Sequence, residues 1–156
     1  MTSMKRRLFI KGSLATGAFG VAVGTGLIPR TTLAAWSKDA FEAKDINGAL
    51  TGLFGSTDHA ASDKIKIKAP DIAENGAVVP VSVTTDIAGA KSISIITEKN
   101  QQPLTASFDL GAGAEGYVST RIKMGKTSNV IAVVKADGKL HSATKEVKVT
   151  IGGCGG

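Results

Sequence analysis

From residue 63 onward, apolar and polar side chains alternate along the chain with a period of two. Successive side chains of a β-strand point to opposite faces of a sheet, so this period is typical of strands buried on one side. The pattern predicts seven or eight short strands, with Asn75-Gly76 and Asp137-Gly138 as turn signals between them. The clearest segments are 65–67, 79–83, 93–95, 104–110, 118–124, 130–134 and 147–151.

No helical pattern separates these segments, and this decides the fold class that we expect. Residues 63–151 are predicted to form an all-β domain, an immunoglobulin-like antiparallel β-sandwich. A small β-barrel is the main alternative. Residues 130–134 are apolar throughout and therefore predict a central strand.

A helical pattern precedes the strands. Residues 37–54 are predicted to form one helix, with Ser37 as its N-cap and Gly55 at its end. Gly48 and Gly52 weaken this helix. A polar loop is expected to follow at 55–62. The residues that approximate one apolar face of the helix are Phe41, Ile46, Ala49, Leu50, Leu53 and Phe54.

The N-terminal 35 residues have the pattern of an export signal. Arg6 and Arg7 precede a glycine-rich apolar stretch of about 17 residues, and small residues follow at Ala34 and Ala35. We interpret this segment as a twin-arginine signal that is cleaved near Ala34 or Ala35, which predicts a periplasmic protein. A retained membrane anchor is the alternative, but the stretch is short for a membrane span.

Removal of this segment changes the charge of the protein. The whole chain has 19 basic and 13 acidic side chains, and five of the basic ones lie in the signal. The mature chain would keep 14 basic against 13 acidic side chains, a formal charge of +1. The sequence therefore gives no basis for a nucleic-acid-binding surface.

The chain ends in Gly152-Gly153-Cys154-Gly155-Gly156, and Cys154 is its only cysteine. Glycine has no Cβ and adopts backbone conformations closed to other residues, so this segment is predicted to be a thin, flexible and exposed arm. A single cysteine cannot form an internal disulfide, so in an oxidising compartment it is free, capped or joined to another molecule. Nothing in the arm would activate the thiol, because its neighbours do not titrate and the terminal carboxylate disfavours a thiolate.

Other candidate sites are weak. His59 could bind a metal together with Asp58 and Asp63, but one loop without a second ligand pattern is more typical of a solvated histidine. His141 lies in phase with apolar strand positions and is interpreted as a partly buried structural histidine. The alternating lysines Lys64, Lys66 and Lys68 are typical of a solvated strand face. Guidance of an acidic partner or an anionic substrate is the other interpretation of these lysines.

The two ends of the chain together resemble those of one family. The residues concerned are the Gly152–Gly156 terminus with Cys154 at its centre, the Arg6-Arg7 pair, and the Ala40-Phe41 helix that ends in Leu53-Phe54-Gly55. In these residues the chain resembles SoxY, the sulfur-carrier subunit of the bacterial Sox thiosulfate-oxidising system.

The resemblance implies a covalent carrier rather than an enzyme, without a cofactor of its own. Cys154 would be the sulfur attachment site, and the swinging arm would consist of Gly152, Gly153, Gly155 and Gly156. The carrier would form a heterodimer with the small sandwich protein SoxZ. It would dock transiently to the heme enzyme SoxAX, the hydrolase SoxB and, where present, the molybdenum-heme dehydrogenase SoxCD. No stable membrane insertion is expected after processing.

Two alternatives are open at this point. A terminal Gly155-Gly156 also occurs in small cytosolic sulfur carriers that use a C-terminal thiocarboxylate, but the export signal and the many strands argue against that class. An exported immunoglobulin-like module could instead use Cys154 for an intermolecular disulfide. The expected division of the chain is a cleaved signal at 1–35, a helix and loop at 36–62, a β-sandwich at 63–151 and a carrier arm at 152–156.

Overall fold

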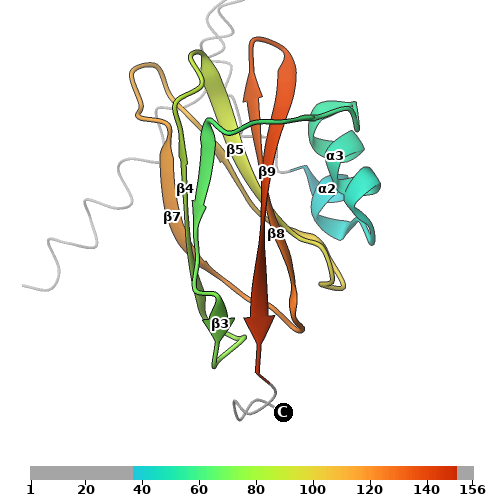
Figure 1. The fold of residues 1–156 in the computed structure, drawn as a ribbon. Helices are drawn as coiled ribbons and strands as arrows, with labels where there is room; N and C mark the ends of the chain where they lie inside the picture. Colours follow the sequence, from blue (N-terminus) through green and yellow to red (C-terminus); the bar gives the residue numbers. More distant parts are fainter. Residues whose placement is uncertain (1–36, 151–156) are drawn as a thin grey trace, which may run out of the picture. The chain divides into compact units, whose positions relative to one another are not determined.

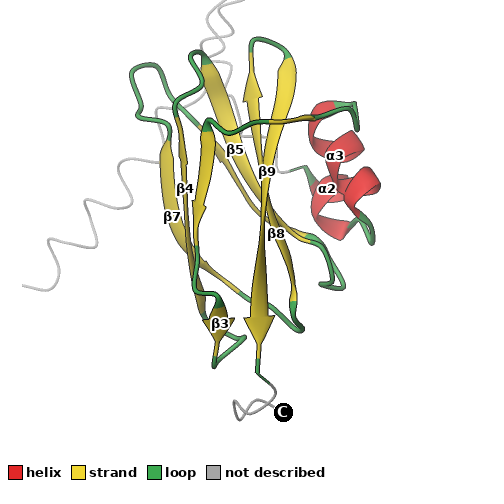
Figure 2. Cartoon of the chain, in the orientation of Figure 1, coloured by secondary structure: helices red, strands yellow, loops and turns green. Residues whose placement is uncertain are grey.

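The computed structural model describes residues 37–150. The export signal expected at 1–35, Ile151 and the arm expected at 152–156 lie outside the described residues. The elements are α2 (Lys38–Glu42), α3 (Ile46–Phe54), β1 (Ala60–Ala61), β2 (Ile65–Lys68), β3 (Ile72–Ala73), β4 (Val79–Thr85), β5 (Ala90–Thr97), β6 (Leu104–Asp109), β7 (Tyr117–Ile122), β8 (Ser128–Ala136) and β9 (Lys139–Val149). The short helices α2 and α3 lie beside the strands, which form two layers (Figure 1, Figure 2).

The described strands form two separate sheets. The larger sheet has the order β1-β9-β8-β5-β6, with β3 also paired to β9, and the smaller has the order β2-β4-β7. The long pairs are antiparallel, whereas β1 and β3 pair with β9 in parallel. Two stacked sheets confirm a sandwich rather than a barrel, and β8 is a central strand, as its apolar run predicts.

The main core lies between the two sheets. Every second residue of β4 is buried there, and the inward residues of β5 and β8 face them. The fully apolar contact removes these side chains from water, which is the dominant stabilising contribution to such a fold. The buried members of this core are Ile65, Ala73, Val79, Val81, Val83, Ile93, Ile95, Val118, Ile122, Met124, Val130, Ala132, Val134 and Val147.

A second, smaller core explains why β8 is apolar on both faces. The helices α2 and α3 cover the outer face of the larger sheet (Figure 1). Leu50 and Ala49 of α3 pack there against Val133 of β8, while Val134 points into the main core. A strand covered on both sides has no polar face and therefore loses the alternation. The predicted apolar face of the helical region is confirmed, since all six of its residues belong to this second core.

The prediction of one helix over 37–54 is wrong, because the chain breaks between α2 and α3. Ala43 adopts an extended backbone (φ −55°, ψ 143°), and Asp45 caps α3 by accepting a hydrogen bond from Gly48 N at 2.7 Å. Ser37 makes no capping hydrogen bond, and its hydroxyl instead donates to Gly52 O at 2.8 Å. Gly52 has a packing role, because a Cβ there would lie 2.8 Å from the backbone of Ala40.

The structure differs from the sequence prediction at two short strands and agrees with it at the turns. The loop expected at 55–62 contains the short strand β1, and β3 was not anticipated. The two turns are where the sequence predicts them. Asp137 (φ 47°) and Gly138 (φ 76°) both have positive φ, as a tight hairpin turn requires, and Gly55 ends α3 in the left-handed conformation. None of the described helices is long and apolar enough to cross a membrane.

Candidate functional site: the strand end that carries the cysteine arm

The final strand holds the chain in place up to four residues before Cys154. Near its end, β9 pairs with β3 in parallel, where Ala73 lies opposite Val149. Lys148 N donates to Asp71 O at 2.9 Å, and Thr150 N donates to Ala73 O at 3.1 Å. The backbone is therefore hydrogen-bonded as far as Thr150, and the arm leaves from a defined point of the domain.

On the other side of β9, beyond the end of its pairing with β8, a threonine side chain binds the strand backbone. The last pair between β8 and β9 joins Ser128 to Val147. Beyond it, Thr127 Oγ1 accepts a hydrogen bond from Val149 N at 2.9 Å and lies 3.4 Å from Val149 O, to which it donates. Both backbone groups of Val149 are thus bound by one side chain. This contact extends the ladder by one residue toward the arm.

The loop that carries Thr127 is itself braced. Asn100, in the turn after β5, donates from Nδ2 to Lys123 O at 2.7 Å and accepts at Oδ1 from Gly125 N at 3.1 Å. A side-chain amide that satisfies a backbone donor and a backbone acceptor of one loop fixes that loop in a single position. Thr127 is therefore held in register with Val149.

Gly76 packs closely against this end of β9 and against the 123–127 loop. Its carbonyl accepts from Met124 N at 2.7 Å, and a Cβ at this position would collide with the Met124 carbonyl and lie 2.8 Å from Val149 Cγ1. The Asn75-Gly76 turn predicted from the sequence is present, with Asn75 Oδ1 accepting from Ala77 N at 2.9 Å. Glycine is needed here for close approach, which the sequence pattern alone does not reveal.

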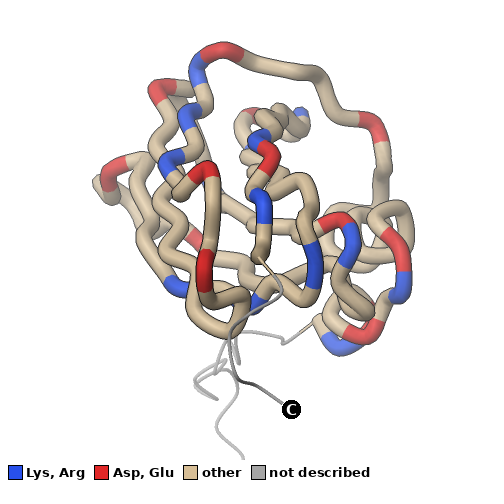
Figure 3. Tube along the Cα trace, turned by 60° about the horizontal axis from the view of Figure 1, so that its bottom comes forward, with Lys and Arg blue, Asp and Glu red and all other residues tan. Residues whose placement is uncertain are grey.

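The predicted site residue Cys154 and the four glycines of the arm lie outside the described residues. The structure therefore shows the base of the arm, formed by β9, β3, the 74–78 turn and the 123–127 loop. Charges of both signs surround this end of the domain (Figure 3). Lys145 forms an ion pair with Asp71 at 2.9 Å, which ties β9 to the segment before β3.

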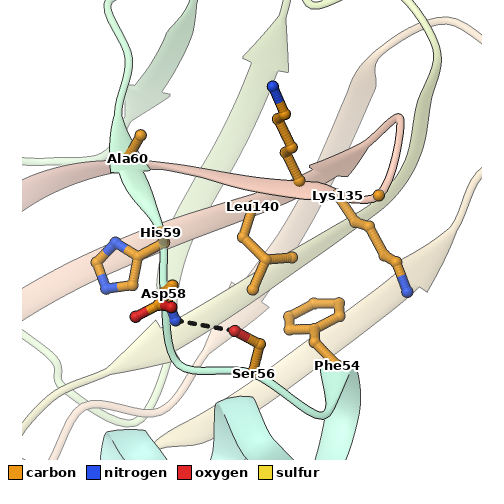
Figure 4. A pocket seen from close by; sticks show the side chains of 9 residues that line it. Phe54, Ser56, Asp58, His59, Ala60, Lys135 and Leu140 are labelled. Atoms are coloured by element: carbon orange, nitrogen blue, oxygen red, sulfur yellow. Dashed lines mark hydrogen bonds between the residues drawn. The ribbon is translucent and has the colours of Figure 1, made fainter.

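The weaker candidates lie elsewhere. His59 is exposed, and its Nδ1 lies 2.8 Å from Ser142 Oγ. It lines a pocket of about 620 Å³ (Figure 4). Lys139 and Leu140 also line this pocket, so it lies beside the β8–β9 hairpin at the start of β9. Lys135 in this pocket lies over Phe54, with 5.7 Å between Nζ and the ring centroid. Within residues 37–150, no three His, Cys, Asp or Glu side chains are arranged to hold a metal ion. His141 is half-buried on β9, as expected.

We expect Thr127→Val to loosen the base of the arm without unfolding the domain. The change leaves the half-buried amide of Val149 without its acceptor, which costs about 1–3 kcal/mol of unfolding free energy. Urea denaturation measures this loss, and hydrogen exchange at Val149 should become faster. Thr144→Val is the matched control, because Thr144 is exposed on the same strand and its replacement should change stability by less than about 0.5 kcal/mol. Equal effects of the two substitutions would contradict the role of Thr127.

Comparison with known proteins identifies the family. The family model described as sulfur oxidation protein SoxY matches residues 50–154. The chain belongs to the SoxY family. Among solved structures, that of the sulfur carrier protein SoxY from Chlorobium limicola f thiosulfatophilum is 52% identical, with a TM-score of 0.61. That similarity covers 66% of this chain and 94% of the other. No curated protein matches the sequence.

The matched range has a structural meaning. It begins in α3, includes every described strand and reaches Cys154. The resemblance to SoxY inferred from the two ends of the chain is therefore confirmed. The residues at the base of the arm, Thr127, Asn100 and Gly76, lie inside the match but were not singled out from the sequence. Only the turn signal of Asn75-Gly76 pointed toward them.

Proposed function

We propose that this protein is a periplasmic covalent carrier of sulfur intermediates in thiosulfate oxidation, with Cys154 as its attachment site. One observation carries the proposal. The SoxY family match extends to Cys154, the only cysteine of the chain, which lies four residues beyond Thr150, whose backbone amide is still hydrogen-bonded to the domain. The thiol is thus separated from a rigid domain by a short segment that contains two glycines.

In this proposal the carrier contributes one reactive atom, the sulfur of Cys154. The Cys154 thiol joins the outer sulfur of thiosulfate, which forms a Cys–S–S–SO₃⁻ adduct and releases one proton and two electrons. The partner heme enzyme SoxAX accepts the electrons. Water then cleaves the adduct in SoxB, which leaves a persulfide on Cys154 and releases sulfate. SoxCD, where present, oxidises the remaining sulfane sulfur.

The glycine arm suits this role because a cargo passed among several enzymes must enter several narrow pockets. Side chains larger than hydrogen would widen the segment, and glycine avoids this at the cost of more backbone entropy on each entry. Covalent attachment keeps the intermediates from diffusing away. The domain behind the arm presents the cysteine, and the partner enzymes supply the catalytic groups.

We assign SoxZ as the stable partner. Among the described strands, β6 ends one sheet, and β2 and β7 flank the other. Unpaired strand edges invite association, and a second small sandwich protein can cover them. The leader with Arg6 and Arg7 would direct the folded complex to the periplasm, which is consistent with a single thiol kept for covalent chemistry.

Intact-mass analysis tests this proposal directly. Purified protein incubated with thiosulfate and SoxAX should gain the mass of one S₂O₃ unit, and addition of SoxB should reduce the gain to one sulfur atom. A protein that gains no sulfur, and instead runs as a disulfide-linked dimer on non-reducing gels, would contradict the carrier role. That result would favour an exported interaction module.

A further inference from the structure

Within residues 37–150, no helix or strand covers the outer face of the smaller sheet, in contrast to the outer face of the larger one, which α2 and α3 cover. The strands β2, β4 and β7 bury alternate residues in the core and turn the others outward. We call this outward set the cationic face. Its members are Lys66, Lys68, Pro80, Ser82, Thr84, Tyr117, Ser119 and Arg121.

The charges on this face have one sign. Lys66, Lys68 and Arg121 project from it, and none of the described outward residues on the three strands is acidic. The two ion pairs found within residues 37–150, Lys38 with Glu42 and Lys145 with Asp71, lie elsewhere. The mature chain as a whole is nearly neutral. The face is therefore a local concentration of positive charge on a balanced protein.

A hydrogen-bonded group of hydroxyls lies between the cations. Ser82 and Ser119 are cross-strand partners, with 2.9 Å between their oxygens. Their hydrogen bonds with the Tyr117 phenol, together with the nearby Lys68, lower the pKa of Tyr117. Tyr117 is nevertheless 51% exposed. Tyrosine and arginine, together with tryptophan, are enriched among the residues that contribute most of the binding energy at protein interfaces.

We propose that the cationic face is the surface on which an acidic partner enzyme docks transiently when the arm delivers its cargo. The inference rests on the proposed carrier function and adds the docking face and the charge of its partner. The carboxylates of the enzyme would meet Lys66, Lys68 and Arg121. Tyr117 and the two serines would supply the central contact.

Three features of the face favour this occupant. A second copy of the chain would bring cations against cations, which opposes self-association. A permanent subunit needs a more apolar surface than one exposed tyrosine and one proline supply. Charge-dominated interfaces associate fast and separate easily, and a carrier that visits several enzymes needs both properties.

The face is also connected to the base of the arm. Arg121 lies one residue before the end of β7, and the chain then runs through Met124, bonded to Gly76, to Thr127, bonded to Val149. An enzyme seated on the cationic face would therefore hold the point at which the arm leaves the domain. This orients the arm toward the enzyme and leaves only the last residues to search for the active site.

Charge reversal tests the proposal in the mature heterodimer with SoxZ. The variant is Lys66→Glu, Lys68→Glu and Arg121→Glu, and the matched control is Lys44→Glu, Lys91→Glu and Lys139→Glu. The control reverses three exposed cations elsewhere and changes the net charge equally. Association with purified SoxAX and with SoxB is followed by stopped flow, using unmodified carrier for the first and thiosulfate-loaded carrier for the second.

We expect the face variant to associate with at least one enzyme about tenfold more slowly than the control at low ionic strength. The difference should disappear near 1 M salt, where the Debye length falls to about 3 Å. Thermal unfolding and labelling of Cys154 by a small thiol reagent should be the same in both variants. Tyr117→Ala, which keeps every charge, should speed dissociation without changing the salt dependence.

Equal association rates of the face variant and the control with both enzymes would overturn the docking face. The proposed function is judged separately, from the mass gained by the wild-type protein on incubation with thiosulfate and SoxAX, which accepts the two electrons released. A wild-type protein that gains sulfur while the two variants behave alike refutes only the docking face. A wild-type protein that gains no sulfur refutes the carrier function and the docking inference with it.

Discussion

Replacement of Cys154 by serine should leave the folded domain unchanged and abolish thiosulfate-dependent oxygen uptake in a complete reconstituted system. No other thiol exists in the chain, and a serine hydroxyl cannot form the sulfur–sulfur bond that the carrier role requires. The residue lies beyond Thr150, the last residue with a backbone hydrogen bond to the domain in the described range. The free energy of unfolding should therefore change by less than about 0.5 kcal/mol.

A relocated thiol is the sharpest control for this result. Ala112 is exposed in the turn between β6 and β7, so Ala112→Cys combined with Cys154→Ser restores one accessible thiol away from the arm. This protein should react with small thiol reagents but support no oxygen uptake. Normal turnover by the single variant would show that sulfur is not carried on Cys154. Turnover by the double variant would show that the arm is not needed.

Conversion of both leader arginines to lysine, Arg6→Lys with Arg7→Lys, should hold this protein and SoxZ in the cytoplasm. The twin-arginine route would read the arginine pair itself, so lysines that keep the charge would not preserve the signal. The route carries folded proteins, and a partner without its own leader could cross while docked to this chain. Immunoblots of periplasmic and cytoplasmic fractions measure the distribution of both subunits.

The matching control replaces two neighbouring lysines by arginine. Lys5→Arg with Lys11→Arg keeps the arginine pair and the charge of the leader, so export should continue. If SoxZ reaches the periplasm while the Arg6 and Arg7 variant stays behind, SoxZ does not depend on this leader. The heterodimer could then assemble after export.

Side-chain periodicity predicts the strands of the sandwich because each long strand is buried on one face or on both. In β4, four valine and threonine side chains point into the core and three polar or proline side chains point out, so the burial pattern follows the sequence directly. β8 departs from this alternation for a physical reason, since the helices cover its second face. The apolar run at residues 130–134 correctly predicted that β8 is a central strand.

Local sequence could not reveal the elements that depend on distant partners. β1 and β3 have two residues each, too few for any period, and they exist because β9 offers an unpaired side. The break between α2 and α3 was missed although its signal is local, since Asp45 is a favourable N-cap residue and accepts a hydrogen bond from Gly48 N. Gly52, which weakens a single helix, allows the two to approach closely.

Part of the candidate site could be predicted from local sequence, and part of it depends on contacts between distant residues. A lone cysteine among glycines can be identified from sequence, because its unusual neighbours are adjacent in the chain. The polar residues that hold the base of the arm cannot, because Thr127 and Asn100 act through backbone groups of Val149 and of Lys123 and Gly125. Threonine and asparagine are common in loops, and only their contacts distinguish these two.

The position of the arm at the end of β9 has a mechanical consequence. In the proposed carrier role, an enzyme that holds the cargo would pull on the end of this strand, and a pull along the strand axis would load its pairing with β8. The hydrogen bonds between β9 and β8 run from the Lys139–Ala136 pair to the Val147–Ser128 pair and lie perpendicular to that axis. They resist the force together, in shear, instead of opening one after another from an end. If the protein acts as the proposed carrier, the domain would thus remain folded while its cargo is withdrawn from an enzyme pocket.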